Sequence, residues 1–175
     1  MDVFFETERI LARKLEPEDA KQLYKNHAEA KVKKWFPNES YADISEARDA
    51  IHFFSDCVNQ NRLPFVLAIQ LKKTGELIGD TGVSEVEEEP DALEIGYQIC
   101  EKYNGKGLAT EVLNAMTAFS FARFDATISY GRVVHGNTAS ARVLEKAGYV
   151  FVNEEYGAED DPYGNGMLVY KREAR

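Results

Sequence analysis

The sequence has no long hydrophobic run and very little cysteine. Its 175 residues include only two cysteines, Cys57 and Cys100, which fall in a helix-like and a strand-like segment without metal-type spacing. We therefore expect two reduced thiols, as in a cytoplasmic protein. A membrane-spanning helix needs about 20 apolar residues in succession, so the sequence predicts no membrane partner. The first six residues also lack the basic and apolar parts of a secretory signal.

Positive charge is scarce as well. Lys and Arg number 21 against 30 Asp and Glu, which gives a net charge of −9 and a pI near 4.9. Because affinity for nucleic acid comes largely from basic residues that neutralise phosphates, we expect no nucleic-acid partner. The charge suits a cationic or amine-bearing partner, although solubility alone explains it equally well. His27, His52 and His135 lie in different segments, so no metal site is expected.

Residues 93–119 carry the clearest pattern in the chain. Apolar residues at 93, 95, 97 and 99 alternate as in a strand with one buried face, and those from 108 to 119 recur at helical spacing. A short turn with Gly105 and Gly107 joins the two segments. The first turn of a helix has free N–H groups, so a strand, a glycine turn and a helix N-terminus together predict a phosphate-binding site. The turn has neither Walker nor dinucleotide-fold glycine spacing.

The whole pattern predicts one α+β domain over residues 1–175. We expect the first strand at 9–15, helices starting near 16, 43 and 138, and an irregular segment at 31–41 with Trp35 and Phe36 in a loop. Hairpins are expected at 65–83 and 149–170, the second with a long mobile loop at 160–166. The strand at 128–134 follows the helix from 108, which predicts one parallel crossover in an otherwise antiparallel sheet.

Several segments, in the right order, resemble one known family. Asn104-Gly105-Lys106-Gly107-Leu108-Ala109 looks like the Gln/Arg-x-x-Gly-x-Gly/Ala signature of the GNAT superfamily of acetyl-CoA-dependent N-acetyltransferases. The subfamily that acetylates the N-termini of ribosomal proteins is similar at residues 6–20, 93–97, 109–111, 137–140 and 143–149. The resemblance implies a GNAT-like fold, in which helices flank a twisted, mostly antiparallel sheet with one parallel strand pair. It also implies acetyl-CoA as cosubstrate, no metal, an amine substrate and a homodimer.

Two positions depart from the family pattern. Asn104 stands where the signature has Gln or Arg, which shortens one side-chain contact to a phosphate. Many superfamily members have a Tyr seven residues after the position of Asn137, where it protonates the leaving thiolate, whereas this chain has Leu144. Another group or water must therefore act as the general acid.

The resemblance also implies a set of cofactor contacts. The pyrophosphate is expected on backbone N–H groups of the turn, with a hydroxyl from Thr110, and the pantetheine arm beside the strand that ends at Ile99 and Cys100. Gly96 would open that face of the sheet, or alternatively mark a bulge. Lys106 is either a phosphate contact or a solvated side chain, and Asn137 is an N-cap that also frames the cofactor. The expected cofactor-binding residues are Ile99, Cys100, Asn104, Gly105, Lys106, Gly107, Leu108, Ala109, Thr110 and Asn137.

Two residues are expected to carry the chemistry. Glu94 is the candidate general base, directly or through water; the alternative is a carboxylate paired with a neighbouring Lys or Arg. Ser140 is the candidate donor to the departing sulfur, or simply a serine in a helix cap. A backbone N–H near Ile99 or Cys100 is expected to hold the oxyanion. Cys100 is not expected to act as a nucleophile, because direct transfer needs none.

The acceptor amine is left open between two classes. A free α-amino group has a pKa of roughly 8 and a lysine roughly 10.4, so a protein or peptide N-terminus needs less help to become neutral at pH 7. We therefore expect acetylation of such an N-terminus. The alternatives are a small amine, such as a polyamine, aminoglycoside or amino acid, and a non-catalytic acyl-CoA-binding protein.

Overall fold

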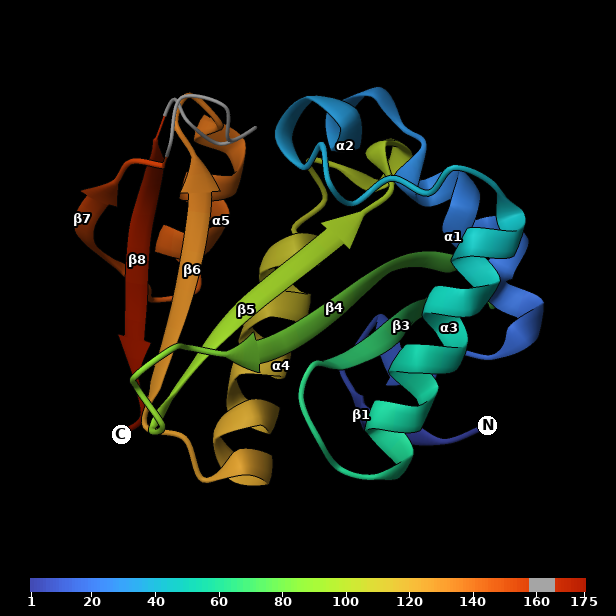
Figure 1. Cartoon of the computed structure of the whole chain (residues 1–175), viewed down its shortest axis with the longest axis horizontal. Coiled ribbons are helices and arrows are strands. Elements are labelled where there is room, and N and C mark those ends of the chain that lie inside the picture. Colours follow the sequence, from blue (N-terminus) through green and yellow to red (C-terminus); the bar gives the residue numbers. More distant parts are fainter. Residues whose placement is uncertain (158–165) are drawn as a thin grey trace.

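The computed structural model describes residues 1–157 and 166–175. Figure 1 shows a twisted sheet with helices on both sides. The strands are β1 (Val3–Glu6), β2 (Ile10–Arg13), β3 (Phe65–Leu71), β4 (Leu77–Glu85), β5 (Ala92–Ile99), β6 (Ile128–Val134), β7 (Val150–Glu155) and β8 (Met167–Glu173). The α-helices are α1 (Ala20–His27), α2 (Ala30–Trp35), α3 (Ile44–Asn59), α4 (Leu108–Phe124) and α5 (Thr138–Lys146), and short 3₁₀ helices cover Pro17–Asp19 and Glu101–Tyr103.

The eight strands form one sheet in the order β1-β2-β3-β4-β5-β6-β8-β7. Only β5 and β6 pair in parallel, through the crossover helix α4, and all other neighbours are antiparallel. The predicted α+β fold with one parallel pair is therefore confirmed. The loop expected at 160–166 falls almost entirely outside the described residues.

The sheet is covered differently on its two faces. α4 and α5 lie on one face, where Val112, Leu113 and Met116 are fully buried against the central strands. α1 and α3 lie on the other face and bury Leu23 and Ile51 there. A helix buries a stripe of side chains spaced three or four residues apart, which is why these apolar positions were readable from the sequence.

Most predicted helix ends are confirmed. Asp43 accepts a hydrogen bond from the N–H of Glu46 at 2.9 Å and starts α3. The Glu46 carboxylate in turn accepts one from the N–H of Ala42. Asn137 accepts from the N–H of Ser140 at 3.3 Å and starts α5. Short polar side chains stabilise these ends because they bond backbone N–H groups that have no helical partner.

The N-terminal half contains two elements that the sequence did not predict. Residues 31–41 were expected to be irregular, but α2 occupies Ala30–Trp35 before the chain breaks at Phe36 and Pro37. Its only buried side chain is Val32, so no repeating apolar pattern marks it. The segment expected as the first strand is the second, because β1 precedes it as a four-residue, partly exposed edge strand. Such short elements carry too little periodicity to be detected.

Candidate active site

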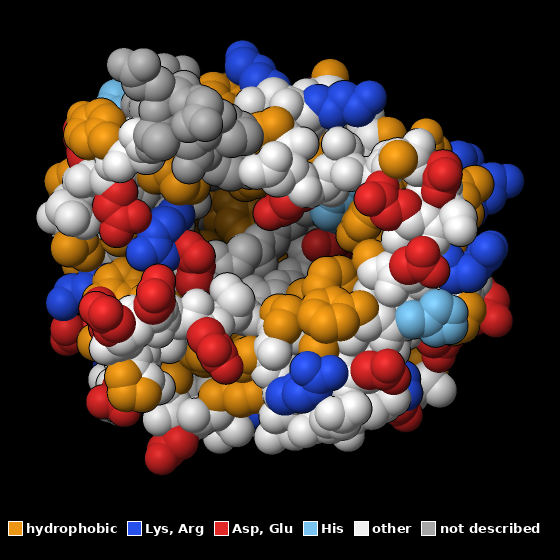
Figure 2. All heavy atoms as spheres, viewed as in Figure 1, with side chains coloured by type: hydrophobic (Ala, Val, Ile, Leu, Met, Phe, Trp, Pro, Cys, Tyr) orange, Lys and Arg blue, Asp and Glu red, His pale blue; other side chains and the backbone are white. Residues whose placement is uncertain are grey.

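The candidate site lies where β5 and β6 separate. The two strands pair only over Ala92–Glu94 and Ile128–Tyr130, and then diverge in Figure 1. Figure 2 shows the surface hollowed over this gap. Gly96 continues the regular β4–β5 register, so the bulge alternative is wrong. A Cβ atom on Gly96 would meet no described atom within 4 Å, so the wall of the gap is open at that point.

The edge of β5 that faces the gap has free backbone groups. The Cys100 N–H donates to the Ile78 carbonyl of β4 at 2.8 Å. Because the backbone groups of a strand point alternately to its two neighbours, the N–H and C=O of Tyr97 and Ile99 point toward β6 instead. The β5–β6 pairing has ended before this point. An extended ligand can therefore pair with β5 here.

The glycine turn after β5 presents a row of N–H groups. Gly105 and Gly107 have φ of +73° and +77°, a region in which other residues are strained, and Gly107 is the N-cap of α4. Among the described residues, the N–H groups of residues 105–110 have no hydrogen-bond acceptor. Free N–H groups and the positive end of the helix dipole favour an anion at this position.

The N-terminal segment braces this turn. Arg9 forms an ion pair with Glu111 at 2.6 Å and donates to the Lys106 carbonyl at 2.8 Å, while Thr7 donates to the Glu111 carboxylate at 2.5 Å. Burial opposes ionisation of Glu111, but the hydrogen bonds from Thr7 and Arg9 outweigh it and lower its pKa. No pattern in residues 7–9 predicted that they would hold a turn about 100 residues later in the chain.

A lysine from α2 reaches the start of the same turn. Lys31 Nζ donates to the Ile99 carbonyl and, at 3.1 Å, to Asn104 Oδ1. Burial lowers the pKa of Lys31. Trp35, one turn further along α2, lies 3.7 Å from the position of a Cβ on Gly136, beyond the end of β6. α2 therefore contacts both sides of the gap, a role that the sequence did not indicate.

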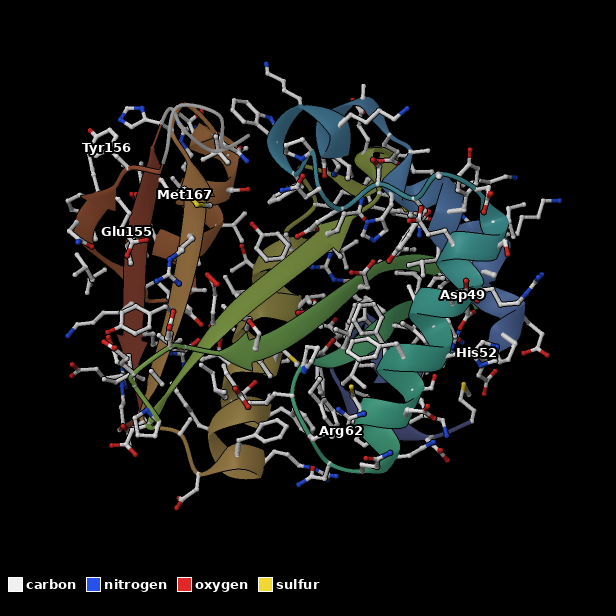
Figure 3. All side chains as sticks on the ribbon, viewed as in Figure 1. Asp49, His52, Arg62, Glu155, Tyr156 and Met167 are labelled. Atoms are coloured by element: carbon white, nitrogen blue, oxygen red, sulfur yellow. The ribbon has the colours of Figure 1, made fainter. Side chains whose placement is uncertain are left out.

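Glu94 forms an ion pair inside the gap. Its Oε1 accepts from Arg132 Nη1 of β6 at 2.6 Å, and the two side chains are 31% and 23% exposed. Arg132 also pairs at 3.0 Å with Glu155, which Figure 3 labels on β7. Glu94 is therefore a carboxylate paired with a neighbouring Arg, which was the alternative interpretation of its sequence position. Glu94 Oε2 accepts no hydrogen bond from the described residues, so it remains available to a substrate.

Ser140 is held at the opposite wall by two neighbours. Asn137 Nδ2 donates to Ser140 Oγ at 3.1 Å, and both polar atoms of the Asn137 side chain are used at this cap. Burial raises the pKa of the Tyr97 phenol, and the nearby Ser140 side chain partly offsets that rise. The contact joins β5 to the first turn of α5 across the gap. Leu144 instead packs over Gly131 of β6 and is 3% exposed.

Cys100 turns away from the gap. Its thiol donates to Asn26 Oδ1 at 3.0 Å, its N–H is bonded to Ile78, and its carbonyl accepts from the Tyr103 N–H at 2.9 Å. Burial raises the pKa of the thiol to about 12, which keeps it protonated. Of the two N–H groups considered for the oxyanion, that of Cys100 is therefore occupied, and that of Ile99 faces the gap.

A second cluster of polar side chains lies on the same face of the sheet as Glu94. His27 Nε2 contacts Asp80 at 2.6 Å and His27 Nδ1 contacts the Glu39 carbonyl at 2.7 Å. Desolvation inside the hollow, followed by the charge of Asp80, raises the pKa of the Glu39 carboxyl, although that side chain still touches solvent. Gln98 lies opposite Asp80 in the register, and its Oε1 is buried without a hydrogen-bond partner among the described residues.

Comparison with known proteins identifies the family. Residues 9–150 match the family described as "Acetyltransferase (GNAT) domain". The chain belongs to the GNAT acetyltransferases. It is 29% identical over 143 residues to an N-acetyltransferase of Bacillus licheniformis called "Uncharacterized N-acetyltransferase p20", with 82% of this chain and 80% of the relative covered.

Solved structures of GNAT acetyltransferases share the fold. The ribosomal-protein-S5-alanine acetyltransferase of Vibrio fischeri superposes with a TM-score of 0.83 at 19% identity, covering 97% of this chain and 95% of that one. RimL, a ribosomal L7/L12 alpha-N-protein acetyltransferase solved in complex with coenzyme A, gives a TM-score of 0.81 at 16% identity, with 98% of each chain covered. The GNAT-like fold inferred from the sequence is therefore confirmed.

The described part of the GNAT domain was compared with the requirements of a metal site and of a membrane-spanning helix. Within residues 1–157 and 166–175, no group of three or more His, Cys, Asp or Glu side chains is arranged to hold a metal ion. His52, labelled in Figure 3, lies on α3 on the other side of the molecule from Glu155. None of the helices that the structure describes is long and apolar enough to cross a membrane.

Proposed function

We propose that this GNAT acetyltransferase transfers the acetyl group of acetyl-CoA directly to a primary amine, and that the acceptor is the α-amine of a protein or peptide N-terminus. The observation that carries the proposal is the continuous ligand-binding surface along the gap. It begins at the open edge of β5 at Tyr97 and Ile99 and runs into the free N–H groups of residues 105–110. An extended arm that ends in a pyrophosphate needs an open strand edge followed by a group of free N–H donors, and this surface provides both in that order.

The cofactor contacts follow from this surface. The backbone of Tyr97 and the second lone pair of the Ile99 carbonyl would pair with the pantetheine arm, and the N–H groups from Gly105 to Thr110 would bind the pyrophosphate. When bound, acetyl-CoA supplies an activated thioester. Lys106 is a weaker candidate for a phosphate contact, because its Nζ lies 5.4 Å from the ring centroid of Tyr103 and its side chain is exposed. Asn137 contributes by positioning Ser140. Cys100 is left out of the proposed cofactor contacts, because its thiol, N–H and carbonyl are bonded elsewhere.

Glu94 takes the proton from the attacking amine through Oε2, the oxygen that Arg132 does not bind. Arg132 fixes Oε1, so the carboxylate cannot rotate freely, and general bases work best when held in place. The Ile99 N–H, which points into the gap, stabilises the negative charge that develops on the carbonyl oxygen. Both groups lie on β5, five residues apart in the chain.

Ser140 gives a proton to the departing sulfur from the other wall of the gap. Its Oγ accepts from Asn137, which leaves the Ser140 hydroxyl hydrogen free to be donated. Tyr97 lies beside Ser140 on the facing strand, and Ser140 regains its proton from solvent. Ser140 replaces the tyrosine that is absent at Leu144, whose side chain lies in the core.

The acceptor side favours a cationic amine that becomes neutral easily. Glu39, Asp80 and Glu94 surround the sheet face beyond Gly96, and only Asp80 and Glu94 have cationic partners, His27 and Arg132. Negative charge attracts an ammonium group before it loses its proton. The names of the ribosomal-protein acetyltransferases with the same fold support an N-terminal acceptor.

The test combines a panel of amines with one pair of variants. Acetyl-CoA turnover should occur with a peptide that has a free N-terminus, and mass spectrometry should place the acetyl group there. The same peptide with a blocked N-terminus and an internal lysine, and a set of polyamines, aminoglycosides and amino acids, complete the panel. Acetylation of small amines alone would overturn the choice of acceptor, and tight acetyl-CoA binding without any turnover would overturn the enzymatic proposal.

Glu94→Gln should lower kcat/KM by about 100-fold or more, the usual effect of losing a general base. Glu85→Gln on neighbouring β4 is the matched control, because Glu85 is exposed and makes no ion pair within the described residues. If Glu94→Gln lowers thermal stability but leaves kcat/KM unchanged, Glu94 only anchors Arg132.

A further inference from the structure

The cradle for the pyrophosphate carries one full positive charge of its own, that of the exposed Lys106. Two negatively charged phosphates must be neutralised in a protein of net charge −9, and position 104 carries Asn instead of Gln or Arg. Backbone N–H groups provide partial charges only. A second full positive charge near the turn would stabilise the pyrophosphate, and it must come from elsewhere in the chain.

The other cations that lie near the turn are engaged elsewhere. Arg9 forms an ion pair with Glu111 at 2.6 Å, and Lys102 forms one with Glu76 at 2.7 Å. Lys106 lies over the Tyr103 ring. A cation already neutralised by a carboxylate contributes little to binding a second anion.

Lys31 is placed differently. It reaches the turn from α2, and its two acceptors, the Ile99 carbonyl and Asn104 Oδ1, are neutral. Among the described residues it forms no ion pair. An ammonium group has three N–H donors, so one remains for a ligand. The amine is partly buried, where a charge interacts more strongly with a nearby anion than it would in water.

We propose that Lys31 of α2 binds the cofactor pyrophosphate and supplies the charge that Asn104 does not. Asn104 acts as a positioning residue, since its side-chain oxygen directs Lys31 Nζ toward the row of N–H groups at 105–110. The inference rests on the proposed use of acetyl-CoA. It also gives a reason for α2, a short helix that carries Lys31 toward one wall of the gap and Trp35 toward the other.

Three ligands distinguish the contribution of the pyrophosphate from that of the 3′-phosphate when binding is measured by titration calorimetry. CoA carries the pyrophosphate and a 3′-phosphate, dephospho-CoA keeps only the pyrophosphate, and pantetheine has neither. Lys31→Met should weaken CoA and dephospho-CoA binding by the same factor, about 10-fold or more, because a charge-assisted hydrogen bond is lost. The kcat/KM for acetyl-pantetheine as donor should not change.

Matched variants complete the test. Lys33→Met removes an exposed lysine from the same helix and should leave all affinities unchanged. Lys31→Arg should recover part of the CoA affinity, and Asn104→Gln, which keeps the side-chain oxygen, should leave it within about twofold of the original protein. Thermal unfolding of each variant shows whether α2 and the end of β5 remain folded.

Other results would overturn the inference in distinguishable ways. An equal loss for pantetheine would mean that Lys31 only supports the end of β5 through the Ile99 carbonyl. A loss confined to CoA would assign Lys31 to the 3′-phosphate, and no loss would remove it from the site. If the unchanged protein fails to bind CoA at all, the proposed function itself is wrong.

Discussion

At the scale of single residues, His27 shows how burial and hydrogen bonding determine a charge. Both ring nitrogens face acceptors, Asp80 Oδ2 and the Glu39 carbonyl, so both must carry a proton. Burial alone would lower the pKa of His27, but the charge of Asp80 and these hydrogen bonds outweigh it and raise the pKa to about 9. A fully bonded imidazolium cannot accept a proton, so His27 is a structural cation and not a second base.

The raised pKa predicts that stability depends on pH. The folded protein holds this proton more tightly than the unfolded chain, whose histidine has the ordinary pKa of 6.5. The contribution is therefore complete below about pH 6.5 and is lost as the pH rises to about 9, by up to about 3 kcal/mol. Chemical denaturation from pH 6 to 9.5 should show this fall in the free energy of unfolding.

The control for this prediction is another histidine. His27→Gln should remove the fall, and His52→Gln, on the exposed side of α3, should retain it. A parallel fall in both variants would show that other groups produce the pH dependence.

At the scale of elements, the N-terminus of α4 depends on a segment from the beginning of the chain. Thr7 and Arg9 bind Glu111 in the first turn of α4, and Arg9 also fixes the Lys106 carbonyl. These contacts keep the backbone of the turn in the shape that presents its N–H groups. Preorganisation of this kind lowers the entropy lost when a ligand binds.

Arg9→Met should therefore weaken CoA binding several-fold although Arg9 contacts only the backbone of the turn and is not proposed to contact CoA. The free energy of unfolding should fall by about 1 kcal/mol, which is typical of a partly exposed ion pair with good geometry. Because the pKa of Glu111 is lowered, the contribution of this contact is present above the ordinary value of 4.5 and is lost as the pH falls below it. Calorimetry and denaturation at pH 7 and pH 4 measure both effects.

Glu8→Gln, one residue earlier in the same segment, is the matched control, because Glu8 is exposed and unpaired among the described residues. CoA affinity that stays the same in Arg9→Met and Glu8→Gln would show that the turn keeps its shape without the brace.

At the scale of the whole molecule, the sheet consists of two parts that meet over a short ladder. β1–β5 and β6–β8–β7 are joined by the three paired residues at each side of the β5–β6 contact and by α4 behind them. Beyond this ladder the gap is crossed by side chains, including the Glu94–Arg132 pair and the Tyr97–Ser140 contact. A ligand in the gap would contact both parts.

Acetyl-CoA should therefore stabilise the folded protein. A ligand at about 100 times its Kd adds about 2.7 kcal/mol, which for a chain of this size corresponds to a rise in Tm of roughly 5–10 °C. Thermal unfolding with and without CoA measures this rise, and pantetheine at the same concentration should give a much smaller one. Equal shifts with both ligands would mean that the phosphates do not contribute.

Local sequence patterns predicted most of the fold. The alternation in residues 93–99, the helical spacing from Leu108 and the caps at Asp43 and Asn137 depend on neighbours within a few residues, so they are visible in the sequence. β1 and α2 were missed because four and six residues contain too little of either period. The parallel pair was predictable because a strand, a helix and a strand connect most simply in that way.

The sequence by itself determined the strand, the glycine turn and the helix that form the cradle, because each depends on local backbone geometry. Only the tertiary structure decided which distant side chains join them. Lys31 meets Ile99 and Asn104 across 68 and 73 residues, and Arg132 meets Glu94 across 38. No periodicity in a sequence encodes such distances, because they depend on how the helices and strands pack. The charge of the cradle and the orientation of the proposed base are therefore properties of the packed fold.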